Sequence, residues 1–179
     1  MVKSIIEKMT EHLSLLKVRR KYKNETLRKV SLCFLIKGNE VLLALKKRGF
    51  AAGKWNGSGG KANPKDKDIK ATAKRETFEE TTVLVKKLKK VGILNFWFEN
   101  QTDWNQQVVV FITREWTGTP TETEEMAPKW FNISSLPFDK MWEDDVFWLP
   151  KVLSGKIVEG NFLFDENQKM LEHKVKEVA

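Results

Sequence analysis

The segment GSGGKANPKDKDIKATAKRETFEETT, residues 57–82, joins a glycine-rich loop to a helical pattern. The pattern predicts a helix over 66–82, capped at its start by Asp66 or Asp68. This helix carries three carboxylates, spaced so that they share one face: Glu76, Glu79 and Glu80. Alone, such a triplet is more often a solvated acidic turn. Beside a glycine-rich loop with accessible carbonyl groups, these hard oxygen ligands favour Mg²⁺ or Mn²⁺ and a phosphate-bearing substrate.

The rest of the chain alternates β-branched and aromatic runs with polar turns, which is typical of short strands. Strands are predicted over 27–36, 40–46, 88–98, 106–116, 129–132, 157–164 and 169–177. A further helix is predicted from Asp144 to about Ser154, despite Pro150 in its interior. These patterns predict a single mixed α/β (α+β) domain over residues 27–179, without internal repeats or long linkers.

Length and composition fit one globular domain with a core of ordinary size. The chain has 179 residues, of which 41% are hydrophobic and 31% charged. No apolar run approaches the roughly 20 residues that a membrane span needs, and no hydrophobic signal segment opens the chain. The single cysteine, Cys33, cannot form an intramolecular disulfide. We therefore expect a cytoplasmic protein without a membrane span, with a nuclear or mitochondrial fraction left open.

The basic surplus lies at the N-terminus. Residues 1–29 carry nine basic and three acidic side chains, whereas the remainder carries 23 and 21. This asymmetry favours a basic arm over a nucleic-acid groove, so a nucleic-acid partner is not expected. Apolar residues recur at helical spacing in this arm: Val2, Ile5, Ile6, Met9, Leu13 and Leu16. We interpret residues 1–26 as a basic amphipathic helical extension that docks on the domain or contacts a partner, polyanion or membrane surface.

Several motifs together resemble one known family. Gly60, Asp66 and Arg75-Glu76-x-x-Glu79-Glu80 resemble the loop-helix-loop box of the Nudix hydrolases. Over residues 28–178 the chain is similar to the MutT-homologue type, which acts on oxidised purine nucleoside triphosphates. The motifs that carry this similarity are Lys46-Lys47-Arg48-Gly49-Phe50, Lys54-Trp55-Asn56-Gly57, Glu125-Met126 and Met141-Trp142-x-Asp144-Asp145-x-x-Trp148.

The resemblance implies a Nudix fold, in which a mixed β-sheet is sandwiched between helices, here with an N-terminal helical extension. It implies hydrolysis of a nucleoside triphosphate to the monophosphate and pyrophosphate by a monomer. The groups that would hold Mg²⁺, with Mn²⁺ possible, are the Gly59 carbonyl, Glu76, Glu79 and Glu80, with Glu125 as a further ligand or base. Arg75 would pin the box helix through an ion pair, and Lys46 would lie near the phosphates.

For the base, the resemblance implies contacts from Asn56, Trp142, Asp144, Asp145, Phe50, Phe96, Ser31 and Leu32. Adjacent carboxylates in an aromatic pocket raise each other's pKa, so one can donate a hydrogen bond while the other accepts. One pocket could then take both 8-oxoguanine and 2-hydroxyadenine. Without the resemblance, Asp144 and Asp145 would be interpreted as helix caps and Trp142 as a core indole. The alternative functions are hydrolysis of another nucleotide and nucleotide binding without turnover.

The sequence departs from the family pattern at three places. The stretch from Gly60 to Arg75 is one residue too long, which puts Lys67 where the family has the glutamate partner of the arginine. The ion pair within the box is therefore expected to be rebuilt or lost. Thr82 replaces the glycine that ends the helix, so we expect a different helix end, because β-branched residues resist the left-handed conformation. The loop over 104–107 also differs, which predicts a drift in base preference.

Overall fold

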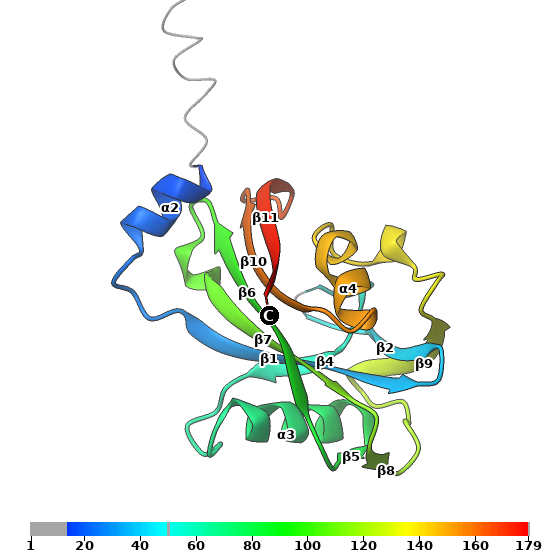
Figure 1. Cartoon of the computed structure of the whole chain (residues 1–179). Helices are drawn as coiled ribbons and strands as arrows, with labels where there is room; N and C mark the ends of the chain where they lie inside the picture. Colours follow the sequence, from blue (N-terminus) through cyan, green and yellow to red (C-terminus); the bar gives the residue numbers. More distant parts are fainter. Residues whose placement is uncertain (1–13, 50, 179) are drawn as a thin grey trace, which may run out of the picture.

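The computed structural model describes residues 14–49 and 51–178 (Figure 1). Its helices are α2 (Leu15–Lys21), α3 (Ile69–Thr81) and α4 (Asp145–Leu153), with short 3-10 turns η1 (Thr102–Trp104) and η2 (Phe138–Lys140). Its strands are β1 (Arg28–Lys37), β2 (Glu40–Lys46), β3 (Trp55–Asn56), β4 (Ser58–Lys61), β5 (Leu84–Val85), β6 (Lys89–Phe98), β7 (Gln106–Thr113), β8 (Trp116–Thr117), β9 (Met126–Asn132), β10 (Ile157–Phe164) and β11 (Met170–Val178). Among the described helices, none is long and apolar enough to cross a membrane.

A mixed sheet organises the domain. Its strand order is β11-β10-β6-β7-β1-β2-β3, with β4 also paired to β1 and β9 to β2. The pairs β1–β7 and β6–β10 are parallel, whereas β1–β2, β1–β4, β6–β7 and β10–β11 are antiparallel. Figure 1 shows α3 on one side of the strands and α4 on the other. The predicted mixed sheet between helices is therefore confirmed.

Strand β1 is buried on both of its faces, which explains its continuous apolar run. Phe34 and Ile36 pack in the core that contains Trp148 of α4. Cys33 and Leu35 point the other way, into the cluster under α3. Because side chains alternate along a strand, β1 joins both cores and fixes the positions of the two helices relative to one sheet.

The box helix begins later than predicted and ends as the family pattern requires. Asp68 caps α3 by accepting a hydrogen bond from the Ala71 backbone N–H at 2.8 Å. At the other end Thr82 adopts the left-handed conformation with φ 63°, so the expectation of a different helix end was wrong. The next residue, Val83, is fully buried. Its burial in the core beneath α3 holds Thr82 in a conformation that a β-branched residue disfavours.

Only the end of the predicted N-terminal helix lies within the described residues. There Leu15, Val18 and Tyr22 pack against Trp97 of β6 in a third apolar cluster. The described part of the helix therefore docks on the domain, as one of the two interpretations expected. Leu16, which the helical spacing placed on the apolar face, is 68% exposed, because the packed stripe runs through positions 15, 18 and 22 instead.

Thr82→Asn is expected to raise the free energy of unfolding by about 0.5–1 kcal/mol, because asparagine tolerates the left-handed conformation better than a β-branched residue. Urea denaturation measures this change. Thr82→Val is the matched control, since it keeps the branch and removes only the hydroxyl, which lies 3.4 Å from the Thr119 carbonyl oxygen. If Thr82→Val raised the free energy of unfolding as much as Thr82→Asn, the explanation would be contradicted.

Candidate active site

One cavity of about 810 Å³ runs from the end of α3 to the start of α4. It brings together most of the site residues expected from the sequence, namely Ser31, Leu32, Lys46, Asn56, Gly59, Glu80, Phe96, Glu125, Trp142, Asp144 and Asp145. Glu76, Glu79 and Arg75 lie beside the cavity in an ion-pair network. Phe50 lies outside the described residues. The cavity thus has a carboxylate end and an aromatic end.

The glycine-rich segment is a strand rather than the expected loop. Ser58–Lys61 pairs antiparallel with β1, with Gly59 opposite Leu32 and Gly60 opposite Ser31. A Cβ on Gly59 would lie 2.0 Å from the Ser31 carbonyl oxygen, and one on Gly60 would lie 2.3 Å from the Glu76 carboxyl carbon. Glycine is therefore required at position 59, where the neighbour is the backbone of β1, whereas a side chain at position 60 would displace the Glu76 carboxylate.

Glu80 is the most deeply buried carboxylate at this end, with 4% of its surface exposed. Its Oε2 accepts a hydrogen bond from the Gly59 backbone N–H at 2.9 Å, and its Oε1 lies 3.9 Å from Lys46 Nζ. Burial raises the pKa of Glu80 to about 7, although the Gly59 N–H and Lys46 act in the opposite direction. Burial also raises the pKa of Glu76. For both carboxyl groups, burial outweighs the stabilising effect of the nearby cations on the ionised form.

Arg75 clamps the segment before α3 to the helix. Its Nε and Nη2 donate to the two oxygens of Asp66 at 3.0 and 2.9 Å, in a bidentate pair. Its Nη1 donates to Glu76 at 2.8 Å and to Glu79 at 3.0 Å. The ion pair of the box is therefore rebuilt on Asp66, and the extra residue leaves Lys67 exposed. The hydrogen bond from Arg75 is the main reason that the pKa of Asp66 is lowered.

Glu125 approaches the cavity from the segment before β9. Its carboxylate lies 3.4 Å from Lys46 Nζ and 3.1 Å from Arg48 Nη2. The hydrogen bond from Arg48, together with the charge of Lys46, lowers the pKa of Glu125. Glu125 therefore stays ionised where the more buried Glu80 does not fully do so.

The carboxylate oxygens in these ion pairs are the type of ligand that a hard divalent cation prefers. Among the described residues, two groups of ion pairs, one around Arg75 and one around Lys46 and Arg48, together contain six carboxylates and these three cations. This leaves a surplus of negative charge, while burial is the main cause of the raised pKa values of Glu76 and Glu80. Within the described chain, however, no three carboxylates, histidines or cysteines already converge as metal ligands. The side chains of Glu79 and Glu125 are about half exposed.

At the aromatic end, Asp144 and Asp145 are both buried, with 2% of their surfaces exposed. Asp144 accepts a hydrogen bond from Trp148 Nε1 at 2.9 Å, and Asp145 accepts one from the Trp142 backbone N–H at 3.0 Å. Asp144 occupies the N-cap position of α4, yet its side chain forms no capping hydrogen bond. The alternative of a simple cap pair is therefore not supported.

Burial raises the pKa values of both aspartates above the usual value for this residue. It raises the pKa of Asp144 to about 6, although the hydrogen bond from Trp148 and, to a smaller extent, the charge of Lys54 act in the opposite direction. It also raises the pKa of Asp145 well above the usual value of an aspartate, and the neighbouring Asp144 charge adds to the effect. With both pKa values raised, a proton stays on this pair more readily than on free aspartates, and a protonated carboxyl donates a hydrogen bond where an ionised one accepts.

The remaining walls at this end are aromatic and amide groups. Trp142 lines the cavity and contacts Phe164 edge to face, at 6.2 Å between ring centroids, so it is a wall residue rather than a core indole. Lys54 lies 5.1 Å above the same indole. Asn56 orients its carboxamide by accepting the Gly57 backbone N–H at Oδ1, at 2.8 Å. Asn56 lines the cavity at this end.

Several cavity residues were missed from the sequence, among them Arg28, Phe98, Trp104 and Phe164. Phe98 follows Phe96 by two positions on β6, so strand alternation predicts that both face the same cavity. Phe164 sits opposite Phe98 in the parallel β6–β10 pair, which the sequence does not reveal. Trp104 lies on η1, within the divergent loop, and packs edge to face on Phe98 at 5.5 Å between centroids.

Comparisons with known proteins agree with this geometry. A model of the NUDIX domain family matches residues 26–152. The oxidized purine nucleoside triphosphate hydrolases of Danio rerio and Mus musculus are each 40% identical to this chain, over 149 and 153 residues. These alignments cover 83% and 86% of this chain, and 94% and 97% of the two relatives.

Solved structures share the fold. A MutT protein from Bacillus halodurans is 25% identical and superposes with a TM-score of 0.74, covering 84% of this chain and 98% of its own. A MutT NUDIX hydrolase from Burkholderia pseudomallei, 22% identical, superposes with a TM-score of 0.57 over 63% of this chain and 88% of its own.

Asp66→Asn is expected to lower the melting temperature above about pH 4, because Arg75 loses the charged half of its bidentate pair. The folded-state pKa of Asp66 is lowered, so its stabilisation is present above the unfolded value of 3.8 and disappears as the pH falls further. The difference between wild type and variant should shrink accordingly in thermal denaturation at low pH. Lys67→Glu serves as the control, and a gain in stability from it would argue that Asp66 does not replace the family glutamate.

Asp145→Asn is expected to raise the melting temperature at pH 8 by about 2 °C or more, because it removes one of two adjacent buried charges. The folded-state pKa values of the pair exceed the 3.8 of a free aspartate, so the native state binds more protons and loses stability as the pH rises. The difference should vanish near pH 4, where both carboxyls are protonated. Asp139→Asn, at an exposed site, is the control. A lower melting temperature of Asp145→Asn at pH 8 would contradict this.

Proposed function

The chain belongs to the Nudix family, and we propose that it hydrolyses oxidised purine nucleoside triphosphates, such as 8-oxo-dGTP and 2-hydroxy-(d)ATP, to the monophosphate and pyrophosphate. The observation that carries this proposal is the single cavity, which joins a carboxylate cluster to a buried aspartate pair with aromatic walls. A triphosphate can extend from one end to the other. The relatives in zebrafish and mouse, named for this activity, support the same assignment.

At the carboxylate end, the Gly59 carbonyl, Glu76, Glu79 and Glu80 would hold Mg²⁺ or Mn²⁺, with Glu125 as a further ligand or base. A bound divalent cation supplies charge that offsets the negative charge of the phosphates and of the attacking oxygen. Glu80 is oriented for this role by the Gly59 N–H. Lys46, which already bridges Glu80 and Glu125, would turn to a phosphate oxygen once the cation neutralises those carboxylates.

At the aromatic end, the purine would lie against Trp142, with its edge toward Asn56 and the Asp144–Asp145 pair. The pair presents a donor and an acceptor in either order, because its shared proton can reside on either carboxyl. An 8-oxoguanine and a 2-hydroxyadenine present different donor and acceptor patterns, and both could be matched. Unmodified guanine would leave a buried carboxyl group without a partner, which disfavours its binding.

The proposal includes a setting for this reaction. The protein would act as a monomer in the cytoplasm on free nucleotides, with a nuclear or mitochondrial fraction also compatible, and would remove oxidised precursors before polymerases use them. A small-molecule substrate fits the volume of the cavity. The body of the chain beyond residue 29 is nearly balanced in charge, which does not favour a nucleic-acid track.

The deciding experiment measures pyrophosphate release from 8-oxo-dGTP, 2-hydroxy-dATP and dGTP, with and without Mg²⁺. We expect metal-dependent turnover, with kcat/KM for an oxidised purine about tenfold or more above that for dGTP. Metal-dependent turnover without this preference would favour the alternative of a Nudix hydrolase for another nucleotide. No turnover of any of the three would favour nucleotide binding without catalysis.

Two variants assign the ends of the cavity separately. Glu80→Gln is expected to lower kcat about 100-fold or more on every substrate, whereas Glu115→Gln, at an exposed ion pair with Lys87, should change nothing. Asn56→Ala is expected to reduce the preference for oxidised purines while leaving metal dependence intact. Retained preference in Asn56→Ala would remove this residue from the base pocket, and full activity of Glu80→Gln would overturn the metal assignment.

A further inference from the structure

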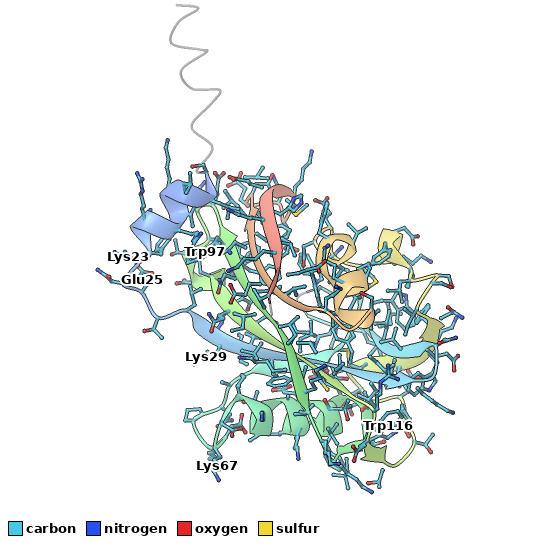
Figure 2. The ribbon with its side chains drawn as sticks, viewed as in Figure 1. Lys23, Glu25, Lys29, Lys67, Trp97 and Trp116 are labelled. Carbon is cyan, nitrogen blue, oxygen red and sulfur yellow. The ribbon has the colours of Figure 1, made fainter. Side chains whose placement is uncertain are left out.

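A second cavity, of about 410 Å³, lies on the opposite face of the sheet from the active site. Its walls come from the end of α2 and the segment after it, and its floor comes from β6, β7 and β10. Figure 2 shows Lys23 and Glu25 on the segment that follows α2, with Lys29 further along the same stretch of chain. The two cavities share no lining residue. We call this second cavity the α2 groove.

The floor of the α2 groove is a row of three carboxamides in register across three strands. Asn95 pairs with Asn161 of β10 and with Gln107 of β7 in the sheet. Gln107 Nε2 donates to Asn95 Oδ1 at 3.1 Å, and Asn95 Nδ2 donates to Asn161 Oδ1 at 3.2 Å. The row therefore ends in an acceptor, Gln107 Oε1, and a donor, Asn161 Nδ2, which the described side chains do not use.

This polar row lies between two apolar patches of the same sheet face. Trp97 and Leu163 are covered by the described part of the N-terminal helix. Val109 and Phe111 are covered from the other side, in the cluster under α3. Between these two patches the three carboxamides line the groove. Apolar residues at the same positions would have extended the core. The packing of the sheet does not require amides at these positions.

The rim of the α2 groove is cationic. The charged residues that line it are Arg19, Lys23 and Lys29 against a single carboxylate, Glu25. Within the described parts of the chain, these three cations form no ion pair. Trp97, which also lines the groove, has the one buried side-chain polar atom among the described residues that lacks a hydrogen-bond partner, Nε1. The groove therefore has a surplus of positive charge at its rim.

We propose that the α2 groove binds a small phosphate ester whose other end carries a planar hydrogen-bonding edge, as in a nucleoside monophosphate. The phosphate would lie among Arg19, Lys23 and Lys29, which supply the charge for it. The planar edge would pair with the carboxamide row, which offers both a donor and an acceptor. The volume of the groove is within the range of small-molecule sites.

The test uses the full-length protein without metal and follows the indole N–H resonances of its tryptophans during titration with AMP. Trp97→Phe assigns the Trp97 resonance, which reports on the α2 groove. Trp142, on the other face of the sheet, reports on the active site. We expect a saturable shift of the Trp97 resonance, which persists in Asn56→Ala. No saturable shift up to about 10 mM AMP would overturn the proposal.

Matched variants separate a specific site from general attraction to a basic surface. Lys23→Ala/Lys29→Ala should weaken AMP binding at the Trp97 resonance about tenfold or more, whereas Lys65→Ala/Lys67→Ala, at exposed positions before α3, should not. Equal loss in both would overturn the proposal.

Asn161→Ala should weaken binding of AMP but not of inorganic phosphate, and equal affinity of the wild type for the two probes would overturn the role of the carboxamide row. The site and probe differ from those of the hydrolase assay, so either result stands without the other.

Discussion

The rest of the site depends on the ion pairs of Arg75 with Asp66, Glu76 and Glu79. Three carboxylates on one helix face repel one another, and two of them are partly desolvated under β4. The planar guanidinium contacts carboxylates on both sides of the helix start, and it also donates to the Lys61 carbonyl oxygen at 3.3 Å. It thereby ties β4 and the segment before α3 to the helix and keeps Glu80 under the Gly59 N–H. A lysine could not replace this bidentate geometry.

The second constraint is that one strand serves both ends of the cavity. β1 pairs with β4, which carries the glycines of the carboxylate end, and with β7, whose loop carries Trp104 beside the aromatic end. Its side chains alternate between the two faces, so Val30 and Leu32 line the cavity while Cys33 and Leu35 anchor the packing under α3. The distance between the two ends is therefore set by sheet geometry and not by flexible loops, which is what a reaction on an extended triphosphate requires.

How much could be predicted from the sequence depended on whether local pattern or long-range pairing decides the structure. The period of Ile69–Thr81 and the hairpin around Gly38 are local, and both were predicted. The strand at Ser58–Lys61 was missed because glycine has low β propensity. These residues pair with β1 because the two backbones approach closely there, and a sequence pattern does not show this approach. Asp66 replaces the expected partner of Arg75 through the spacing of a loop, which no helical or strand period encodes. Thr82 takes a conformation that its own propensity opposes, since the burial of Val83 outweighs it.

Both ends of the cavity use the same physical device for different purposes. Each buries adjacent carboxylates with less positive charge than they need, so each has raised pKa values in the free protein. At the α3 end the neighbours include half-exposed glutamates and the cations Lys46 and Arg75, and a divalent cation could relieve the charge that remains. At the α4 end the neighbours are indoles, a backbone N–H and the single cation Lys54, so protonation of a carboxyl relieves the charge instead. The same desolvation therefore favours metal binding at one end and a protonated, hydrogen-bond-donating carboxyl at the other.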